Sequence, residues 1–234
     1  AGVLLHITSL PGPHGIGDFG PEAYRFVDWL ASAKQSLWQW LPTTPVGPGD
    51  SPYQSPSAFA GSPLMVALEP LVQRGWLDAV TLPAEGFASA RVDFPRVIPW
   101  RDEQLRRAAL GFFARAKADE RAAFTAWCEQ TSSWLDDYAL FMALFNAHGM
   151  KPWWQWAEPL RKREKKALAQ ARTQHAREID CCRLVQWCWD EQCRALKRHA
   201  NERGIALVGD IPIYVADNSA DVWSRQIGRA SCRE

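Results

Sequence analysis

Gly2-Val-Leu-Leu-His-Ile7 is a short apolar run that ends where the sequence turns to Thr8-Ser9-Leu10-Pro11-Gly12. Such a run, bounded by turn residues, predicts a buried strand followed by a loop. Pro21 then suits the first turn of a helix, which the spacing of apolar residues predicts over residues 22–34. A second strand is predicted over Ser36-Leu-Trp-Gln-Trp-Leu41, because prolines follow it. This order of strand, helix and strand predicts a parallel α/β sheet or barrel.

A third apolar run, Ile205-Ala-Leu-Val-Gly-Asp210, also predicts a strand, and this one ends in an acid. In barrel enzymes a side chain at the carboxyl end of a parallel strand points into the active site. An aspartate in this place can equally cap a helix or bond to its own loop. Position alone leaves both interpretations of Asp210 open.

The sequence between the second and third strands is mainly helical. Residues 64–100 are mixed, with a short helix near residues 68–75, and helical periodicity then runs through 101–117, 120–148 and 160–203. A connection of this length is large for a βα unit. We therefore expect three parts: residues 1–63 as the first βα units of a barrel with a substrate loop, 64–203 as a helical insertion subdomain, and 204–225 as the third barrel strand and its loop.

Composition argues against several classes of function. The chain has 234 residues, a formal net charge of +1 and no apolar stretch near the roughly 20 residues of a membrane span. No nucleic acid and no membrane is therefore expected as a partner. The six cysteines form no Cys-x-x-Cys pair, which argues against a zinc or redox site. We expect reduced cysteines, a cytoplasmic location and no bound metal.

Gly15-Ile-Gly17-Asp-Phe-Gly20 matches G-x-G-x-x-G, the fingerprint of dinucleotide-binding proteins, and would suggest an NAD-dependent oxidoreductase. Three features argue against this interpretation. Residues 8–14 separate the predicted strand from Gly15, where the fingerprint needs a tight turn. Pro21 follows the third glycine, and no acid closes the second strand to bind a ribose. A turn made with three glycines explains the pattern better.

The loop after the second strand carries the most informative side chains. Asp50-Ser-Pro-Tyr-Gln-Ser-Pro-Ser-Ala-Phe-Ala-Gly61 holds an acid, hydroxyls, an amide and two aromatic rings. Proteins bind sugars by hydrogen bonds to the hydroxyl groups and by stacking aromatic rings on the C–H faces. The loop therefore suits a carbohydrate, and an ordinary packed loop is the alternative.

Several blocks along the chain, taken in order, resemble the signature segments of the amylomaltase family of 4-α-glucanotransferases. They are residues 2–12, residues 15–18, Trp40-Leu-Pro42, residues 50–55 with 57–61, and Gly209-Asp-Ile-Pro-Ile-Tyr-Val215 with Ser219-Ala-Asp-Val-Trp223. Independent blocks in one order are far more specific than a single short motif. The resemblance implies a (β/α)8 TIM barrel of which only the first strands are present, with a large, mainly helical insertion.

The resemblance also implies a retaining reaction that transfers α-1,4-glucan segments between maltooligosaccharides or to glucose, with no cofactor or metal. Tyr53 matches the tyrosine that lines the donor site, Asp50 and Ser51 match the loop around it, and Asp210 matches the acid that ends the third strand. These four residues are expected to bind substrate. The family places its catalytic carboxylates on later strands, so no catalytic residue is assigned to this chain.

The last eight residues, Ile227-Gly-Arg-Ala-Ser-Cys-Arg-Glu234, fit no preceding pattern and correspond to a translated sequencing-library adapter. Residues 226–234 are therefore expected to be non-native. We expect a chain that is truncated before the catalytic carboxylates and inactive alone. The alternatives are a non-catalytic glucan-binding fragment and the NAD-dependent oxidoreductase.

Overall fold

A computed structural model of the chain describes residues 1–225 except 81, 82, 84, 85, 89 and 213. Three strands, β1 (Gly2–Leu4), β2 (Leu37–Gln39) and β3 (Ala206–Val208), form one sheet in the order β1-β2-β3, and both pairs are parallel. The register places Trp38 between Val3 and Leu207. The parallel α/β arrangement predicted from the sequence is confirmed. The segment predicted to be non-native, 226–234, lies outside the described residues.

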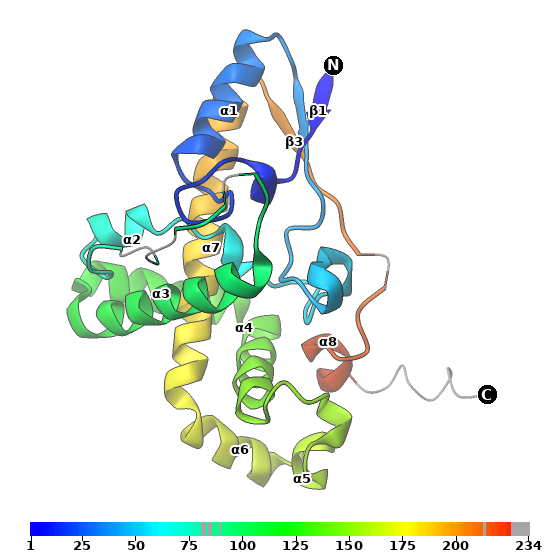
Figure 1. Cartoon of the computed structure of the whole chain (residues 1–234). Coiled ribbons are helices and arrows are strands. Elements are labelled where there is room, and N and C mark those ends of the chain that lie inside the picture. Colours follow the sequence, from blue (N-terminus) through cyan, green and yellow to red (C-terminus); the bar gives the residue numbers. More distant parts are fainter. Residues whose placement is uncertain (81–82, 84–85, 89, 213, 226–234) are drawn as a thin grey trace.

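The two faces of the sheet differ in burial. Trp38 is fully buried and packs with residues of α1 (Pro21–Ser32) and α7 (Ala176–Glu202), as Figure 1 shows for the helices. Leu37 and Val208 belong to the opposite face, because side chains alternate along a strand, and they are 43 % and 38 % exposed. One face is therefore a core, and the other is an open apolar surface.

Helix α1 begins at Pro21. Proline lacks a backbone N–H, but this costs no hydrogen bond here, because the N–H groups of a first helical turn have no partner within the helix. Its buried residues, Ala23, Val27 and Leu30, recur every three or four positions and therefore form one stripe. The helix ends at Ser32, and Lys34 turns the chain with a φ of 55° before β2 begins.

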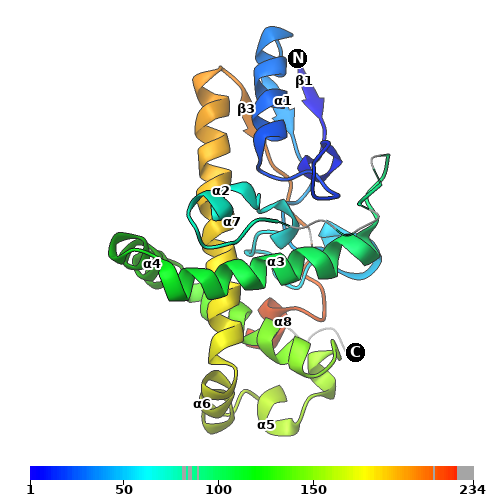
Figure 2. The ribbon, with the colours of Figure 1, turned by 60° about the vertical axis from the view of Figure 1, so that its left-hand side comes forward.

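Helix α7 crosses three hydrophobic cores. Near its start, Ile179 packs in the core formed with α4 (Ala118–Ala147), α6 (Lys165–Gln174) and α8 (Ala220–Ser224). In the middle, Trp187 packs with α2 (Glu69–Gln73) and α3 (Phe94–Arg115). Near its end, Leu196 and Ala200 pack under the sheet. Figure 2 shows this helix running through nearly the whole length of the molecule. The boundary at residue 203 stays a prediction, and α7 contributes to the cores on both sides of it.

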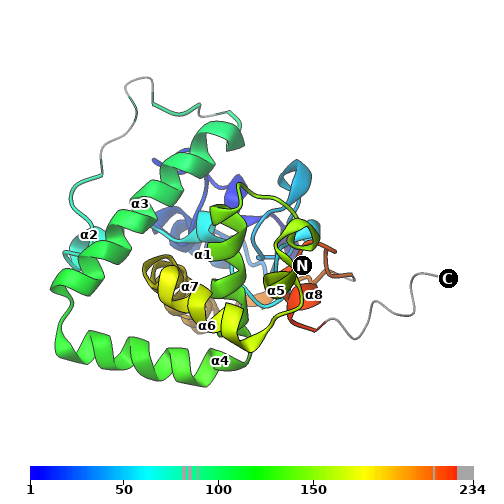
Figure 3. The same cartoon turned by 90° about the horizontal axis from the view of Figure 1, so that it is seen from below.

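Helices α3 and α4 lie along two sides of α7 when the molecule is seen from below (Figure 3). Helix α3 begins at Phe94, before the predicted start at residue 101, although Pro99 lies inside it. Pro95 occupies the first turn, where proline is tolerated, and the buried Val97 and Arg101 hold the next turns against the rest of the protein. The remaining helix, α5 (Glu158–Arg161), is short. Among the described residues, no helix is long and apolar enough to cross a membrane.

Candidate functional site at the carboxyl ends of the strands

The carboxyl ends of parallel strands meet at one edge of a sheet, so the loop after β2 and the residues after β3 are neighbours. The Tyr53 hydroxyl donates a hydrogen bond to Asp210 Oδ2 over 2.7 Å. Asp210 Oδ1 accepts a second bond, from the Ile211 backbone N–H at 2.8 Å. The bond to Asp210 raises the pKa of Tyr53. The structure thus brings together two of the four residues predicted to bind substrate.

The other two predicted residues, Ser51 and Asp50, shape the backbone that leads to Tyr53. Ser51 caps the short 3-10 helix η3 (Pro52–Gln54), and its Oγ accepts a bond from the Tyr53 backbone N–H at 3.3 Å. Asp50 ends the preceding 3-10 helix η2 (Pro48–Asp50) with a φ of 56°, a conformation that aspartate tolerates better than most residues. Ser51 therefore orients the backbone at Tyr53, and the exposed Asp50 forms the turn before it.

The loop predicted to bind substrate, residues 43–63, is folded closely on itself, and we call it the substrate loop. Thr44 Oγ1 donates to the Pro52 carbonyl at 2.8 Å. At Gly47 an added Cβ would lie 1.7 Å from the Gln54 carbonyl oxygen, so only glycine permits this approach. Ser57 Oγ accepts bonds from the backbone N–H groups of Phe59 and Ala60. These contacts fix the conformation of the loop.

Helix α8 holds the same loop from outside. Asp221 Oδ2 accepts a bond from the Ala58 backbone N–H at 2.9 Å, and the Ala220 N–H donates to the Pro56 carbonyl at 2.8 Å. Ser219 caps this helix, because its Oγ accepts from the Val222 N–H. The segment after β3 therefore supplies both Asp210 and a support for the loop that carries Tyr53.

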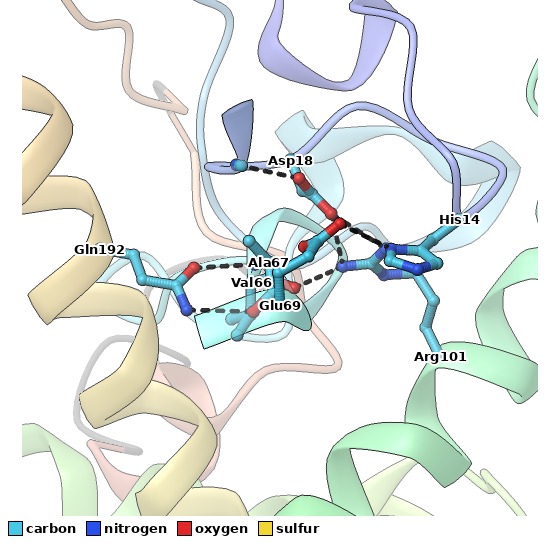
Figure 4. Close-up of polar contacts among 8 residues, drawn as sticks. His14, Asp18, Val66, Ala67, Glu69, Arg101 and Gln192 are labelled. Carbon is cyan, nitrogen blue, oxygen red and sulfur yellow. Dashed lines mark hydrogen bonds and ion pairs between the residues drawn. The ribbon is translucent and has the colours of Figure 1, made fainter. Parts of the chain in front are cut away.

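Two glutamines of α7 bind the chain at and beyond the end of the substrate loop. Gln186, 2 % exposed, accepts a bond from the Gly61 N–H at 2.8 Å and donates to the Gly61 carbonyl at 2.9 Å. Gln192 binds Ala67 in the same way, at 2.7 and 3.1 Å (Figure 4). We call these two pairs the glutamine clamps. A Cβ at residue 61 would lie 2.1 Å from the Trp189 ring, so the clamped chain lies directly against α7.

Sequence reasoning missed the glutamine clamps. One feature of the sequence could have indicated them: Gln186 lies between Leu184 and Trp187 on the apolar side of a predicted helix. A buried amide needs hydrogen-bond partners, so a glutamine there indicates a contact with backbone or another polar group. Its partner, 125 residues away, cannot be inferred from the pattern.

The structure does not favour the dinucleotide interpretation of residues 15–20. The Gly20 N–H, which precedes α1, donates to Asp18 Oδ1 at 2.9 Å, and a carboxylate at this helix start would repel a pyrophosphate. Asp18 is 6 % exposed and also bonds to the fully buried Arg101. At Gly17 an added Cβ would lie 2.1 Å from the Ile7 carbonyl oxygen, so this glycine permits close packing of the turn.

The fold and the site together define a class of protein: an α/β protein with a parallel sheet and a candidate site at the carboxyl ends of its strands. The sequence profile of the 4-alpha-glucanotransferase family matches residues 5–227, and the chain therefore belongs to this family. The resemblance seen in the sequence blocks is confirmed.

Relatives and solved structures agree with this assignment. The chain is 48 % identical over 223 residues to a 4-alpha-glucanotransferase from Thermus thermophilus, covering 95 % of the chain and 44 % of that protein. It is 37 % identical to a chloroplastic/amyloplastic 4-alpha-glucanotransferase from Solanum tuberosum, covering 97 % of the chain and 40 % of that protein. The chain thus spans less than half the length of these curated relatives.

The fold matches that of a solved amylomaltase. The amylomaltase from Streptococcus agalactiae, determined in complex with acarbose, superposes with a TM-score of 0.89 at 35 % identity, covering 97 % of this chain and 46 % of that one. The prediction of a partial (β/α)8 barrel with a helical insertion is confirmed.

Proposed function

We propose that the protein to which this chain belongs is a 4-α-glucanotransferase that moves α-1,4-glucan segments between maltooligosaccharides or to glucose. In the retaining reaction one carboxylate attacks the anomeric carbon, and a second acts first as acid and then as base. Transfer replaces hydrolysis when a second sugar, rather than water, occupies the acceptor position.

The observation that carries this proposal is the bond between Tyr53 and Asp210 at the carboxyl edge of the sheet. The tyrosine ring is 43 % exposed, so its face is available to stack on a sugar. The carboxylate beside it can accept bonds from sugar hydroxyls. A tyrosine paired with an acid on two different barrel loops suits one glucose unit placed across both loops.

The catalytic carboxylates are proposed to lie in a part of the protein outside this chain. The open face of the sheet supports this, because Leu37 and Val208 lie on an apolar surface that further barrel strands would cover. By itself the chain is proposed to bind glucans weakly and to lack transferase activity.

The test compares the 234-residue chain with a protein that continues the reading frame past residue 225. Both are incubated with maltotriose, and the products are separated by chromatography. We expect glucose and longer maltooligosaccharides from the longer protein and none from the chain. Glucose and maltose without longer products would indicate hydrolysis. Failure of a folded, longer protein to act on maltotriose would contradict the proposal and favour a glucan-binding role.

A further inference from the structure

Three acceptor side chains gather where the turn before α1 meets the start of α2. His14 and Asp18 come from the turn before α1, and Glu69 begins α2 (Figure 4). One possible ligand atom from each, a ring nitrogen or a carboxylate oxygen, lies within 4.8 Å of the others. We propose that these three side chains bind one divalent transition-metal ion, which joins the turn before α1 to α2.

The imidazole of His14 gives the strongest support. His14 is 6 % exposed, and its ring stacks on Trp100 with a centroid distance of 5.7 Å, which fixes the ring plane. Its Nδ1 is buried and makes no hydrogen bond to any described residue. A buried ring nitrogen without a partner is costly unless it binds something. It lies 3.7 Å from Glu69 Oε1, too far for a hydrogen bond but within reach of an ion about 2.1 Å from each atom.

The carboxylates supply the rest of the donor set. Glu69 Oε2 is also buried without a hydrogen bond among the described residues. Asp18 Oδ2 already accepts two bonds from Arg101, but Oδ1 accepts only one, from Gly20, and keeps a lone pair for a further partner. One nitrogen and two carboxylate ligands suit a borderline ion such as Zn²⁺ or Co²⁺.

The local charge also favours a second cation. Asp18 and Glu69 both act electrostatically on Arg101. Two carboxylates beside one guanidinium leave a net charge of −1 when both are ionised, which attracts a further cation.

Of the three side chains, Glu69 is the most exposed to solvent. Glu69 lines a cavity of about 590 Å³ between α1, α2 and α7, and its side chain is 34 % exposed. Gly20 lines the same cavity, and a Cβ there would lie 2.7 Å from Asp18 Oδ1. None of the residues predicted to bind sugar borders this cavity, so the proposed ion is structural and does not depend on the proposed transferase activity.

Cobalt(II) titration of the 234-residue chain at pH 7.5 tests the proposal. Visible absorption separates ligand types, because cysteine thiolates add an intense near-ultraviolet charge-transfer band that histidine and carboxylates lack. We expect a visible band that saturates at one equivalent without the thiolate band. The melting temperature should rise with cobalt, because the ion binds only the folded chain.

Variants identify the ligands. Glu69→Gln keeps the side-chain shape and should weaken cobalt affinity by at least about 10-fold, as should His14→Ala. Glu191→Gln is the matched control, since Glu191 lines the same cavity and pairs with Arg74. It should keep the affinity of the unchanged chain. Far-ultraviolet circular dichroism checks that each variant is folded.

Three results would overturn the proposal: no cobalt band, a band with thiolate character, or equal affinity in the folded Glu69→Gln variant. An NMR titration adds an independent readout. If His14 takes up a proton near neutral pH whether or not cobalt is present, the second cation is the imidazolium itself and the metal site is excluded.

Discussion

Tyr53 and Asp210 are 157 positions apart in the sequence, yet the hydroxyl of one donates to the carboxylate of the other over 2.7 Å. The contact joins the loop after β2 to the end of β3. Each partner has its own backbone support, from Ser51 and from the Ile211 N–H. These supports hold the pair in place, and if it binds sugar as proposed, less ordering is required on binding.

Removing this hydrogen bond should weaken sugar binding. We expect Tyr53→Phe and Asp210→Asn each to lower the affinity for acarbose by roughly 10-fold, which corresponds to about 1.4 kcal/mol. The double variant should lose less than the sum, because both changes remove one shared bond. Calorimetric titration measures the affinities. The control is Tyr24→Phe on α1, which removes a hydroxyl outside the pair and should leave the affinity for acarbose unchanged. If the effects of Tyr53→Phe and Asp210→Asn are strictly additive, the bond between these residues is irrelevant to binding.

The glutamine clamp at Gly61 should stabilise the fold. Gln186→Ala leaves a buried N–H and a buried carbonyl without their partner, so we expect a loss of about 2–4 kcal/mol in the free energy of unfolding. Urea denaturation followed by circular dichroism measures this loss. Gln130→Ala on the exposed side of α4 should change stability by less than about 0.5 kcal/mol. Equal effects of the two changes would contradict the role given to the clamp.

Arg101 is fully buried and bonds to Asp18 and to the Val66 carbonyl. Arg101→Met should cost about 3–5 kcal/mol of stability, because it leaves the buried Asp18 carboxylate without its positive partner. Adding Asp18→Asn to this variant should recover part of the loss, since the unpaired charge is then removed. Urea unfolding of the single and double variants tests this, and a double variant that is less stable than Arg101→Met would refute it.

His6 should make the fold sensitive to acid. Burial lowers the pKa of His6 from 6.5 to about 4. Between these values the unfolded chain binds a proton that the folded chain does not, so stability falls as the pH drops from 6.5 to 4. At its full extent, this effect of His6 lowers the free energy of unfolding by about 3 kcal/mol. Unfolding free energies measured across this range should depend less on pH in His6→Gln, and an identical pH profile in both proteins would exclude this role.

Much of the fold could be predicted because its signals are local. The apolar runs predict three strands in the right places. The helix between the first two is indicated by the spacing of its apolar residues, Tyr24, Phe26, Val27, Leu30 and Ala31. The start of α3 was predicted too late. Pro95 and Pro99 are helix breakers by propensity, but Pro95 lies in the first turn and the buried face of the helix compensates for Pro99.

Long-range polar partners could not be predicted in the same way. Periodicity indicates which face of an element is buried, but it does not name the group on the other side. Asp18 was read as part of a glycine turn, and its partner Arg101 is 83 residues away. Tyr53 and Asp210 were selected for their residue types and their family match. Their direct contact depends on the parallel sheet that places both loops at one edge.

The two glutamine clamps lie six residues apart on α7, and the residues they hold are also six apart. Six helical residues rise about 9 Å, whereas six extended residues would span roughly 20 Å. The 3-10 helix η4 (Pro63–Met65) shortens the intervening chain. An insertion or deletion between residues 62 and 66 would break this match and leave one clamp empty. The length of that segment is therefore fixed by the helix beside it.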